Sequence, residues 1–464
     1  MSAAAPRRPA PLASADGVAA PEARPWKRAA AWLAFLGPFF FLTYGLANWW
    51  TARLAHVGSV RFEWERHIPF WDWTILPYMS IDAFYAASLF LCATRAELDR
   101  HAKRLLLATL VCVTGFLLFP LRFSVERPAT SGFNGMLFDL LAGFDKPFNQ
   151  APSLHVALLI LLWVVYARHL RGAAAWALHA WFALIGVSVF TTFQHHAIDG
   201  LAGAAVGVVC LYAVPDGPWR WRWRRAAAAS IDATDAAMRA RLARRYLAGA
   251  AACAALAAWA GGWGWALMWP AAALGLVAGA YAGWGEAVFQ KRADGRASAA
   301  SRLLLAPYRA GAWLSSRAFT RRGARDAQVA EGVRIGRAPG GRDWSALDAG
   351  VAVLDLAAEF EAGRAARARP YRSVPMLDLV APGVEQLAEA VAALDALRAR
   401  GPVLVHCALG RSRSAVVAAA WLLREGMARD ADDAVARIRA ARPDVVLPER
   451  YRQALRAFDA ARGA

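Results

Sequence analysis

The residues best suited to chemistry lie near the end of the chain, in Pro402–Ser414, which reads PVLVHCALGRSRS. A short apolar run leads into a turn that contains Cys407 and Gly410, and a helix-like run starts at Ser414. A strand that delivers a loop onto a helix N-terminus directs backbone N–H groups and the helix dipole at one point, which makes an anion site. A cysteine placed there is favoured as the thiolate, which is the nucleophilic form. Arg413 follows six residues later with a fork of donors that suits phosphate oxygens.

The alternative is a buried structural cysteine in an arginine-rich chain, where Cys-x5-Arg arises by chance. A histidine before the cysteine, a glycine inside the loop and a serine after the arginine favour the functional interpretation. This loop resembles the signature loop of the cysteine-dependent dual-specificity phosphatases. The resemblance implies that Cys407 takes the phosphoryl group, Arg413 holds its oxygens, and an upstream aspartate protonates the leaving oxygen. We assign phosphate binding to Gly410, Ser412 and Ser414, and ordering of the loop backbone to His406.

The general acid is expected in a loop that precedes the helix leading to the Cys407 strand. Asp378 stands at the place where dual-specificity phosphatases carry their acid. Asp355 competes for the role, but it is embedded in a strand-like run. We therefore interpret Asp355 as structural.

Composition indicates a membrane protein. The chain has 464 residues, of which 58% are hydrophobic and 21 are Trp, and its net charge is +19. Basic loops and interfacial tryptophans suit a protein that faces anionic lipid. Nucleic acid competes as a partner for such charge, but the basic residues cluster between apolar runs and no nucleic-acid motif occurs. The four cysteines other than Cys407 fall inside apolar runs, so no disulfide framework is implied. We predict neither a metal nor a cofactor.

About eight apolar runs are candidate transmembrane helices, although some are short against the ~20 residues that a span needs. Alternate connections carry clusters of Arg and Lys, which predicts that these connections and both termini lie in the cytoplasm. Cys407 then faces a compartment in which thiols stay reduced. The runs are 29–49, 75–93, 105–120, 154–166, 173–193, 201–214, 246–261 and 264–283.

Two histidines form a second chemical cluster on the outer face predicted by this topology. His155 opens the fourth run, and His195 closes the fifth at the same level. Antiparallel neighbours should bring the two imidazoles together. Asp199 lies four residues after His195, so on a helix its carboxylate can orient the imidazole. The alternative is that both histidines are ordinary interfacial residues.

The pair Arg-Pro at 127–128, the turn Pro-Ser-Leu-His at 152–155 and the spacing His-x3-Asp resemble the type 2 phosphatidic acid phosphatase superfamily, particularly its inositol phosphorylceramide synthase-like branch. The chain departs from the family pattern at Pro120, where the family has Lys, and at Val189, where it has Arg. His196 is the alternative to His195 as nucleophile. The resemblance implies that Arg127 and Ser153 bind phosphate, His155 protonates the leaving group, His195 attacks and Asp199 holds His195.

We thus predict a polytopic all-α membrane bundle followed by a soluble α/β dual-specificity phosphatase domain. Near the C-terminus, short apolar runs at 333–335, 351–356, 373–375 and 403–406 read as strands. The predicted organisation is a disordered tail over 1–28, a six-helix membrane domain over 29–214, a basic loop with two further spans over 215–285, a basic membrane-surface linker over 286–330 and the phosphatase domain over 331–464.

The predicted function is a bifunctional phosphatase of a bacterial inner membrane. The Cys407 site would act on a phospholipid headgroup and the histidine site would act as a lipid phosphatase or phosphotransferase. One alternative is a membrane-anchored protein tyrosine phosphatase. Another is a bundle that serves only as a lipid transporter or scaffold.

Overall fold

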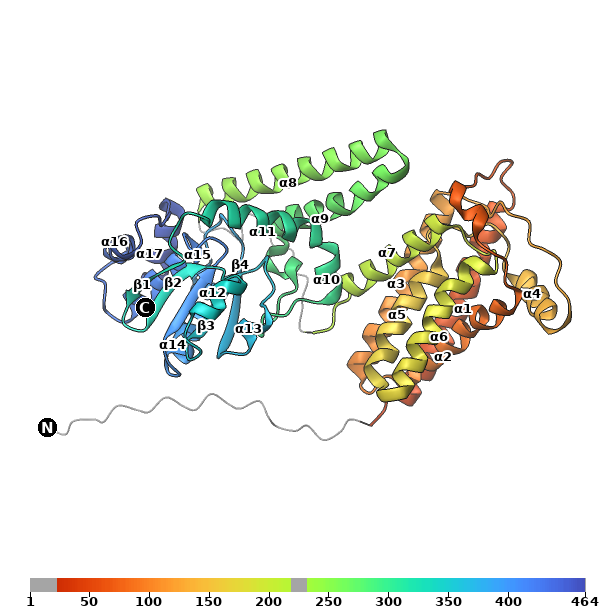
Figure 1. Cartoon of the computed structure of the whole chain (residues 1–464), viewed down its shortest axis with the longest axis horizontal. Coiled ribbons are helices and arrows are strands. Elements are labelled where there is room, and N and C mark those ends of the chain that lie inside the picture. Colours follow the sequence, from red (N-terminus) through yellow and green to blue (C-terminus); the bar gives the residue numbers. More distant parts are fainter. Residues whose placement is uncertain (1–22, 218–231, 464) are drawn as a thin grey trace. The chain divides into compact units, whose positions relative to one another are not determined.

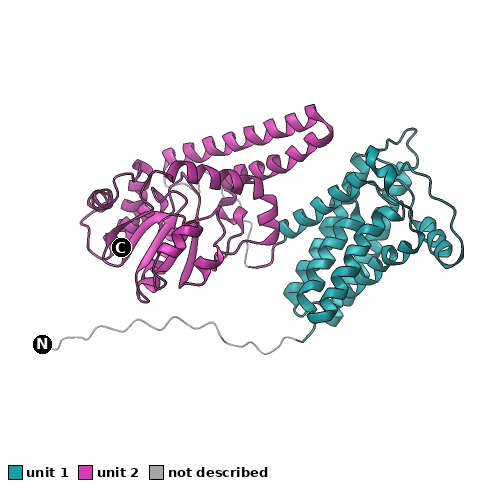
Figure 2. Cartoon of the chain, in the orientation of Figure 1, with its two compact units in different colours: residues 1–214 teal, residues 215–464 magenta. Residues whose placement is uncertain are grey.

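The structure is a computed structural model that describes residues 23–217 and 232–463. The chain divides into two compact units, residues 1–214 and 215–464 (Figure 2). Most of the predicted N-terminal tail and the basic run Trp219–Arg225 lie outside the described residues.

The first unit is helical (Figure 1). Its core consists of aliphatic and aromatic side chains such as Leu105, Leu162 and Phe182, which are fully buried. The helices are α1 (Trp26–Thr51), α2 (Ile75–Leu91), α3 (Arg95–Leu118), α4 (Gly132–Phe144), α5 (Leu154–His169), α6 (Gly172–Thr191) and α7 (Ala197–Ala213).

Five helical segments in the described residues are long and apolar enough to cross a membrane. The predicted total of eight stays a prediction. Helices α5 and α7 have 16 and 17 residues, which is short for a bilayer core about 30 Å thick. The predicted run 246–261 falls in a longer helix whose first half carries four arginines. The five segments are Trp26–Thr51, Asp72–Leu91, Arg95–Leu118, Gly172–Thr191 and Gly262–Phe289.

Helices α5 and α7 approach each other closely because α7 presents glycine at the crossing. A Cβ atom on Gly203 would lie 2.2 Å from the carbonyl oxygen of Ser153. Ser153 caps α5, since its Oγ accepts a hydrogen bond from the N–H of Val156 at 3.3 Å. The glycine therefore fixes the N-terminus of α5, where His155 lies.

The second unit contains a five-stranded mixed sheet with the order β1-β2-β5-β3-β4. Strand β1 is antiparallel to β2, and the remaining pairs are parallel. Strand β5 lies at the centre, so the carboxyl end of β5 is flanked by two parallel neighbours. The strands are β1 (Asp326–Ala330), β2 (Val333–Arg337), β3 (Ala352–Ala357), β4 (Tyr371–Met376) and β5 (Val403–Cys407).

Apolar side chains bury the central strands, and every residue of β3 and β5 is buried. The four predicted strands correspond to β2 to β5. Strand β1 was not predicted, because its sequence DAQVA mixes polar and apolar residues and forms no apolar run. The helices of this domain are α12 (Gly341–Ala346), α13 (Arg364–Arg367), α14 (Val384–Arg398), α15 (Arg413–Arg424), α16 (Ala431–Ala441) and α17 (Glu449–Gly463).

The residues before the sheet form α8 (Ala233–Ala260), α9 (Met268–Gly279), α10 (Ala299–Leu304) and α11 (Ala306–Thr320). Short helical segments precede and follow α9, namely η3 (Gly262–Leu267), η4 (Ala280–Trp284) and η5 (Gly285–Phe289). Helices α8 and α9 pack against each other as a long hairpin (Figure 1). The base of this hairpin shares an apolar cluster with Leu377 and Val380 of the loop after β4. The hydroxyl of Tyr281 donates a hydrogen bond to the carbonyl oxygen of Asp378 at 3.1 Å. The hairpin therefore buttresses the loop that carries the predicted general acid.

Candidate active site

Cys407 is the last residue of β5, and α15 begins six residues later at Arg413. The N–H of Gly410 lies 3.3 Å from the Sγ atom of Cys407, and the Oγ atom of Ser414 lies 3.6 Å from it. Both donors and the helix N-terminus favour negative charge on the sulfur. The loop therefore directs polar groups at the sulfur atom of Cys407.

Gly410 makes this loop possible. Its φ is +72°, a conformation that residues with a Cβ atom rarely adopt. A Cβ atom at this position would also lie 2.5 Å from the backbone nitrogen of Arg337. Glycine thus lets the loop turn against the end of β2.

The guanidinium of Arg413 is buried and points between two carboxylates. Its Nη1 and Nη2 atoms donate to both oxygens of Glu359, at 2.8 and 2.7 Å, and Nη2 lies 3.2 Å from Asp378 Oδ1. Although burial by itself lowers the pKa of Arg413, the two carboxylates raise it well above its usual range. The Nε–H of Arg413 has no hydrogen-bond partner among the described residues. This donor is therefore available to bind a phosphate oxygen.

Glu359 was not predicted. It follows β3, the parallel neighbour of β5, so its backbone lies near the carboxyl end of the central strand. That position in a parallel sheet was the signal that could have found it. Burial by itself raises the pKa of Glu359, but Arg413 lowers it below its usual range.

Breaking this pair should destabilise the domain. We expect Glu359→Gln to lower the free energy of unfolding by about 2–3 kcal/mol, because a buried guanidinium loses a charged, two-oxygen partner while Asp378 stays. Unfolding in detergent measures the change. The matched control is Glu389→Gln, which removes an exposed carboxylate 3.6 Å from Arg372 and should cost under about 1 kcal/mol. Equal effects of the two changes would contradict the prediction.

Asp378 lies in the loop after β4 with about a third of its side chain exposed (33%). Burial raises the pKa of this carboxyl group, although the nearby Arg413 works against the shift. A raised pKa keeps a proton available at higher pH than an ordinary aspartate does. This arrangement suits a general acid.

Asp355 belongs to a buried structural cluster instead. Its Oδ2 atom accepts hydrogen bonds from Lys291 Nζ and from the Tyr371 hydroxyl, each at 2.7 Å. The Nε2 atom of His406 lies 3.8 Å from the same oxygen. Burial by itself raises the pKa of Asp355, but Lys291 lowers it overall. Lys291 falls in the run that the sequence predicted as a membrane-surface linker, yet it is buried in this cluster.

A pocket of about 760 Å³ opens beside residues 407–413, the predicted catalytic loop. The catalytic loop contributes Leu409 and Ser412. Residues 377–383 after β4, here named the acid loop, contribute Asp378. Other lining residues come from α9 and α11, among them Leu274 and Phe319. The hydroxyl of Ser412 donates to the carbonyl oxygen of Val446 at 2.8 Å, which ties the loop to the segment before α17.

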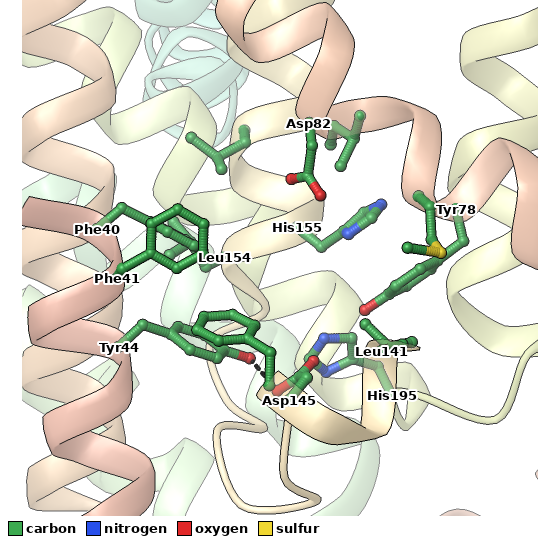
Figure 3. A pocket seen from close by; sticks show the side chains of 14 residues that line it. Phe40, Phe41, Tyr44, Tyr78, Asp82, Leu141, Asp145, Leu154, His155 and His195 are labelled. Atoms are coloured by element: carbon green, nitrogen blue, oxygen red, sulfur yellow. Dashed lines mark hydrogen bonds between the residues drawn. The ribbon is translucent and has the colours of Figure 1, made fainter. Parts of the chain in front are cut away.

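The predicted histidine cluster lies in the first unit. His155 and His195 line one pocket of about 110 Å³ together with Tyr78, Asp82 and Asp145 (Figure 3). The His155 ring stacks on Tyr78 with 4.2 Å between centroids. The pocket thus places both imidazoles beside two carboxylates that the sequence did not single out for it.

The other members of the cluster lie around this pocket rather than in its lining. His195 Nδ1 is 3.6 Å from Asp199 Oδ2, and that oxygen accepts a hydrogen bond from the backbone N–H of His196 at 2.8 Å. The His196 ring points elsewhere, with Nδ1 2.8 Å from Glu65 Oε2. The guanidinium of Arg127 lies over the Phe138 ring at 4.5 Å. The described residues that line the pocket include no lysine or arginine.

Across residues 23–217 and 232–463, no group of three or more His, Cys, Asp or Glu side chains is placed to hold a metal ion.

Residues 351–461 match the family model of the dual specificity phosphatase catalytic domain. This segment is a dual specificity phosphatase domain. It contains β3 to β5, Asp378, Cys407 and Arg413, and it makes the chain a phosphoric monoester hydrolase.

Solved phosphatase structures are similar to part of the chain. Tk-PTP in its active form is 25% identical, with 30% of this chain and 98% of that chain covered and a TM-score of 0.27. Human DUSP28 is also 25% identical, with 30% and 97% covered and a TM-score of 0.25. PTPMT1 in complex with PI(5)P is 22% identical, with 30% and 100% covered and a TM-score of 0.27. No curated protein sequence gives a significant match.

The family match to the dual specificity phosphatase domain lies entirely within the second unit. The match supports the predicted fusion of two families only for its C-terminal part. The residue assignments in both pockets stay predictions.

Proposed function

We propose that the phosphatase domain hydrolyses phosphomonoesters on phospholipid headgroups through a phosphocysteine intermediate. The observation that carries the substrate class is the composition of the pocket beside Cys407. Its lining combines the catalytic and acid loops with Leu274 of α9, which belongs to the candidate membrane span Gly262–Phe289. A lipid phosphate offers a polar end and an apolar body to such a site.

In the first step, the Cys407 thiolate attacks phosphorus and the bond from phosphorus to the lipid oxygen breaks. Arg413 and the loop N–H groups hold the phosphoryl oxygens, and Asp378 gives its proton to the leaving oxygen. In the second step, water attacks the phosphocysteine, and the Asp378 carboxylate takes a proton from that water. The Cys407 sulfur leaves as a thiolate, which the Ser414 hydroxyl stabilises, and inorganic phosphate is released.

The test is phosphate release from a panel of lipid phosphates and phosphotyrosine peptides in detergent micelles. We expect release from at least one lipid phosphate at a higher kcat/KM than from any peptide. Release from peptides and from no lipid would instead support a membrane-anchored protein tyrosine phosphatase.

A second candidate function is a lipid phosphatase or phosphotransferase at His155, His195 and Asp199, facing outward. The observation that favours it is the shared pocket of the two imidazoles (Figure 3). The position of Arg127 on Phe138 speaks against efficient phosphate binding there. Lipid turnover in a Cys407→Ser background that His195→Ala abolishes would support this function. If His195→Ala changes nothing, the bundle is an anchor, scaffold or transporter.

We place the protein in the inner membrane of a bacterium with both termini in the cytoplasm. Support comes from the alternating basic connections and from the need of Cys407 for a reducing compartment. A green fluorescent protein fused to the C-terminus should fluoresce, whereas an active alkaline phosphatase at that position would contradict the topology.

A further inference from the structure

The pocket beside Cys407 has two chemically different ends. Asp378, Arg411 and Ser412 line the end next to the catalytic loop, whereas Pro270 and Leu274 of α9 line another part. Its volume of about 760 Å³ lies within the range of roughly 300–1,000 Å³ that is typical of small-molecule sites. A phosphate group occupies only a small part of such a space.

Leu379, directly after the general acid, belongs to this lining. Its side chain is 46% exposed, and its φ of +63° places a branched residue in the left-handed region. Leucine at such a backbone position is uncommon, and strained residues of this kind cluster at functional sites. This backbone conformation puts an apolar, half-exposed side chain in the pocket lining next to Asp378.

Helix α11 supplies another part of the apolar lining through Ala312 and Phe319. Trp313, Leu314 and Phe319 of this helix are 50–65% exposed. The exposed Arg321 follows at its end. Exposed apolar residues next to basic ones are typical of a helix that lies on an anionic membrane surface.

We propose that the part of the pocket lined by α9 and α11 is an acyl-chain site. This inference rests on the proposed lipid phosphatase function and specifies how the substrate binds. The headgroup phosphate reaches Cys407 while a hydrocarbon chain lies along Leu274, Ala312 and Leu379. The occupant is hydrocarbon rather than peptide, because peptide N–H and C=O groups against these side chains would lose their hydrogen bonds.

The experiment blocks the proposed acyl-chain site with a bulky substitution on α11. Ala312→Trp places a large side chain in the lining, and Ala318→Trp adds the same side chain at an exposed position of the same helix that is not part of the lining. The substrates are dioleoyl phosphatidate and dihexanoyl phosphatidate in mixed micelles and soluble p-nitrophenyl phosphate. The full-length protein in detergent is used throughout.

We expect wild type to prefer the dioleoyl over the dihexanoyl lipid, because burial of each further methylene group is favourable. Ala312→Trp should lower kcat/KM for dioleoyl phosphatidate at least about tenfold more than it lowers kcat/KM for p-nitrophenyl phosphate. Ala318→Trp should behave as wild type on all three substrates.

Two different results would overturn the inference. If wild type cleaves dioleoyl phosphatidate but Ala312→Trp affects lipid and soluble substrate equally, the acyl-chain site is wrong and the lipid phosphatase function stands. If wild type cleaves p-nitrophenyl phosphate but none of the lipid phosphates in the panel, the proposed function itself fails and the acyl-chain site fails with it.

Discussion

Cys407→Ser is expected to lower kcat for phosphomonoester hydrolysis at least about a thousandfold, because a serine hydroxyl at neutral pH is a far weaker nucleophile than a thiolate. The change is small in volume, and the oxygen can still accept the hydrogen bond from Gly410. Binding of substrate should therefore persist while turnover is lost. Phosphate release measures turnover, and retention of the lipid phosphate by the variant protein measures substrate binding.

Cys253→Ser is the matched control for this change. Cys253 is half-buried in the second half of α8, away from the N-terminus of that helix. We expect this variant to keep the activity of wild type on every substrate. If Cys407→Ser retained a tenth or more of the turnover, the phosphocysteine mechanism would be wrong.

Asp378→Asn should lower kcat for lipid phosphates about a hundredfold to ten-thousandfold, which is the usual contribution of general acid catalysis. The loss should be much smaller with p-nitrophenyl phosphate, because nitrophenolate leaves readily without a proton. Comparison of the two substrates thus separates proton donation from structural damage. Equal losses on both substrates would indicate that Asp378 only holds Arg413 in place.

The pH dependence gives an independent check on Asp378. The acid works in its protonated form, and burial raises its pKa. Activity on lipid phosphates should therefore fall as pH rises through that raised pKa, at higher pH than for an ordinary aspartate. In Asp378→Asn this decline on the basic side should disappear. A decline that persists in the variant would assign it to another group.

The strand–loop–helix geometry around Cys407 could be predicted because the residues that form it are close in sequence. Cys407, Gly410 and Arg413 lie within seven consecutive residues, between an apolar strand and a helix, so spacing alone indicates their geometry. Asp378 was predicted through the family resemblance, and the structure places it 3.2 Å from Arg413.

Contacts between distant segments could not be predicted in the same way. Glu359 meets Arg413 across 54 residues, and Lys291 meets Asp355 across 64, so no periodicity in the sequence links either pair. In the first unit, the order of the apolar runs suggested that His155 and His195 would meet. It gave no sign that Asp145, held by the Tyr44 hydroxyl at 2.7 Å, would share their pocket.

The packing of the α8–α9 hairpin under the acid loop bears on where the catalytic domain starts as an independent folding unit. The family match begins at residue 351, and the composition becomes that of a soluble protein near residue 331. A fragment cut at either point would lose the hydrogen bond from Tyr281 and would expose Leu377 and Val380 to water. The segment that has to fold together to keep Asp378 in place therefore begins near Ala233, about a hundred residues before the soluble sequence does.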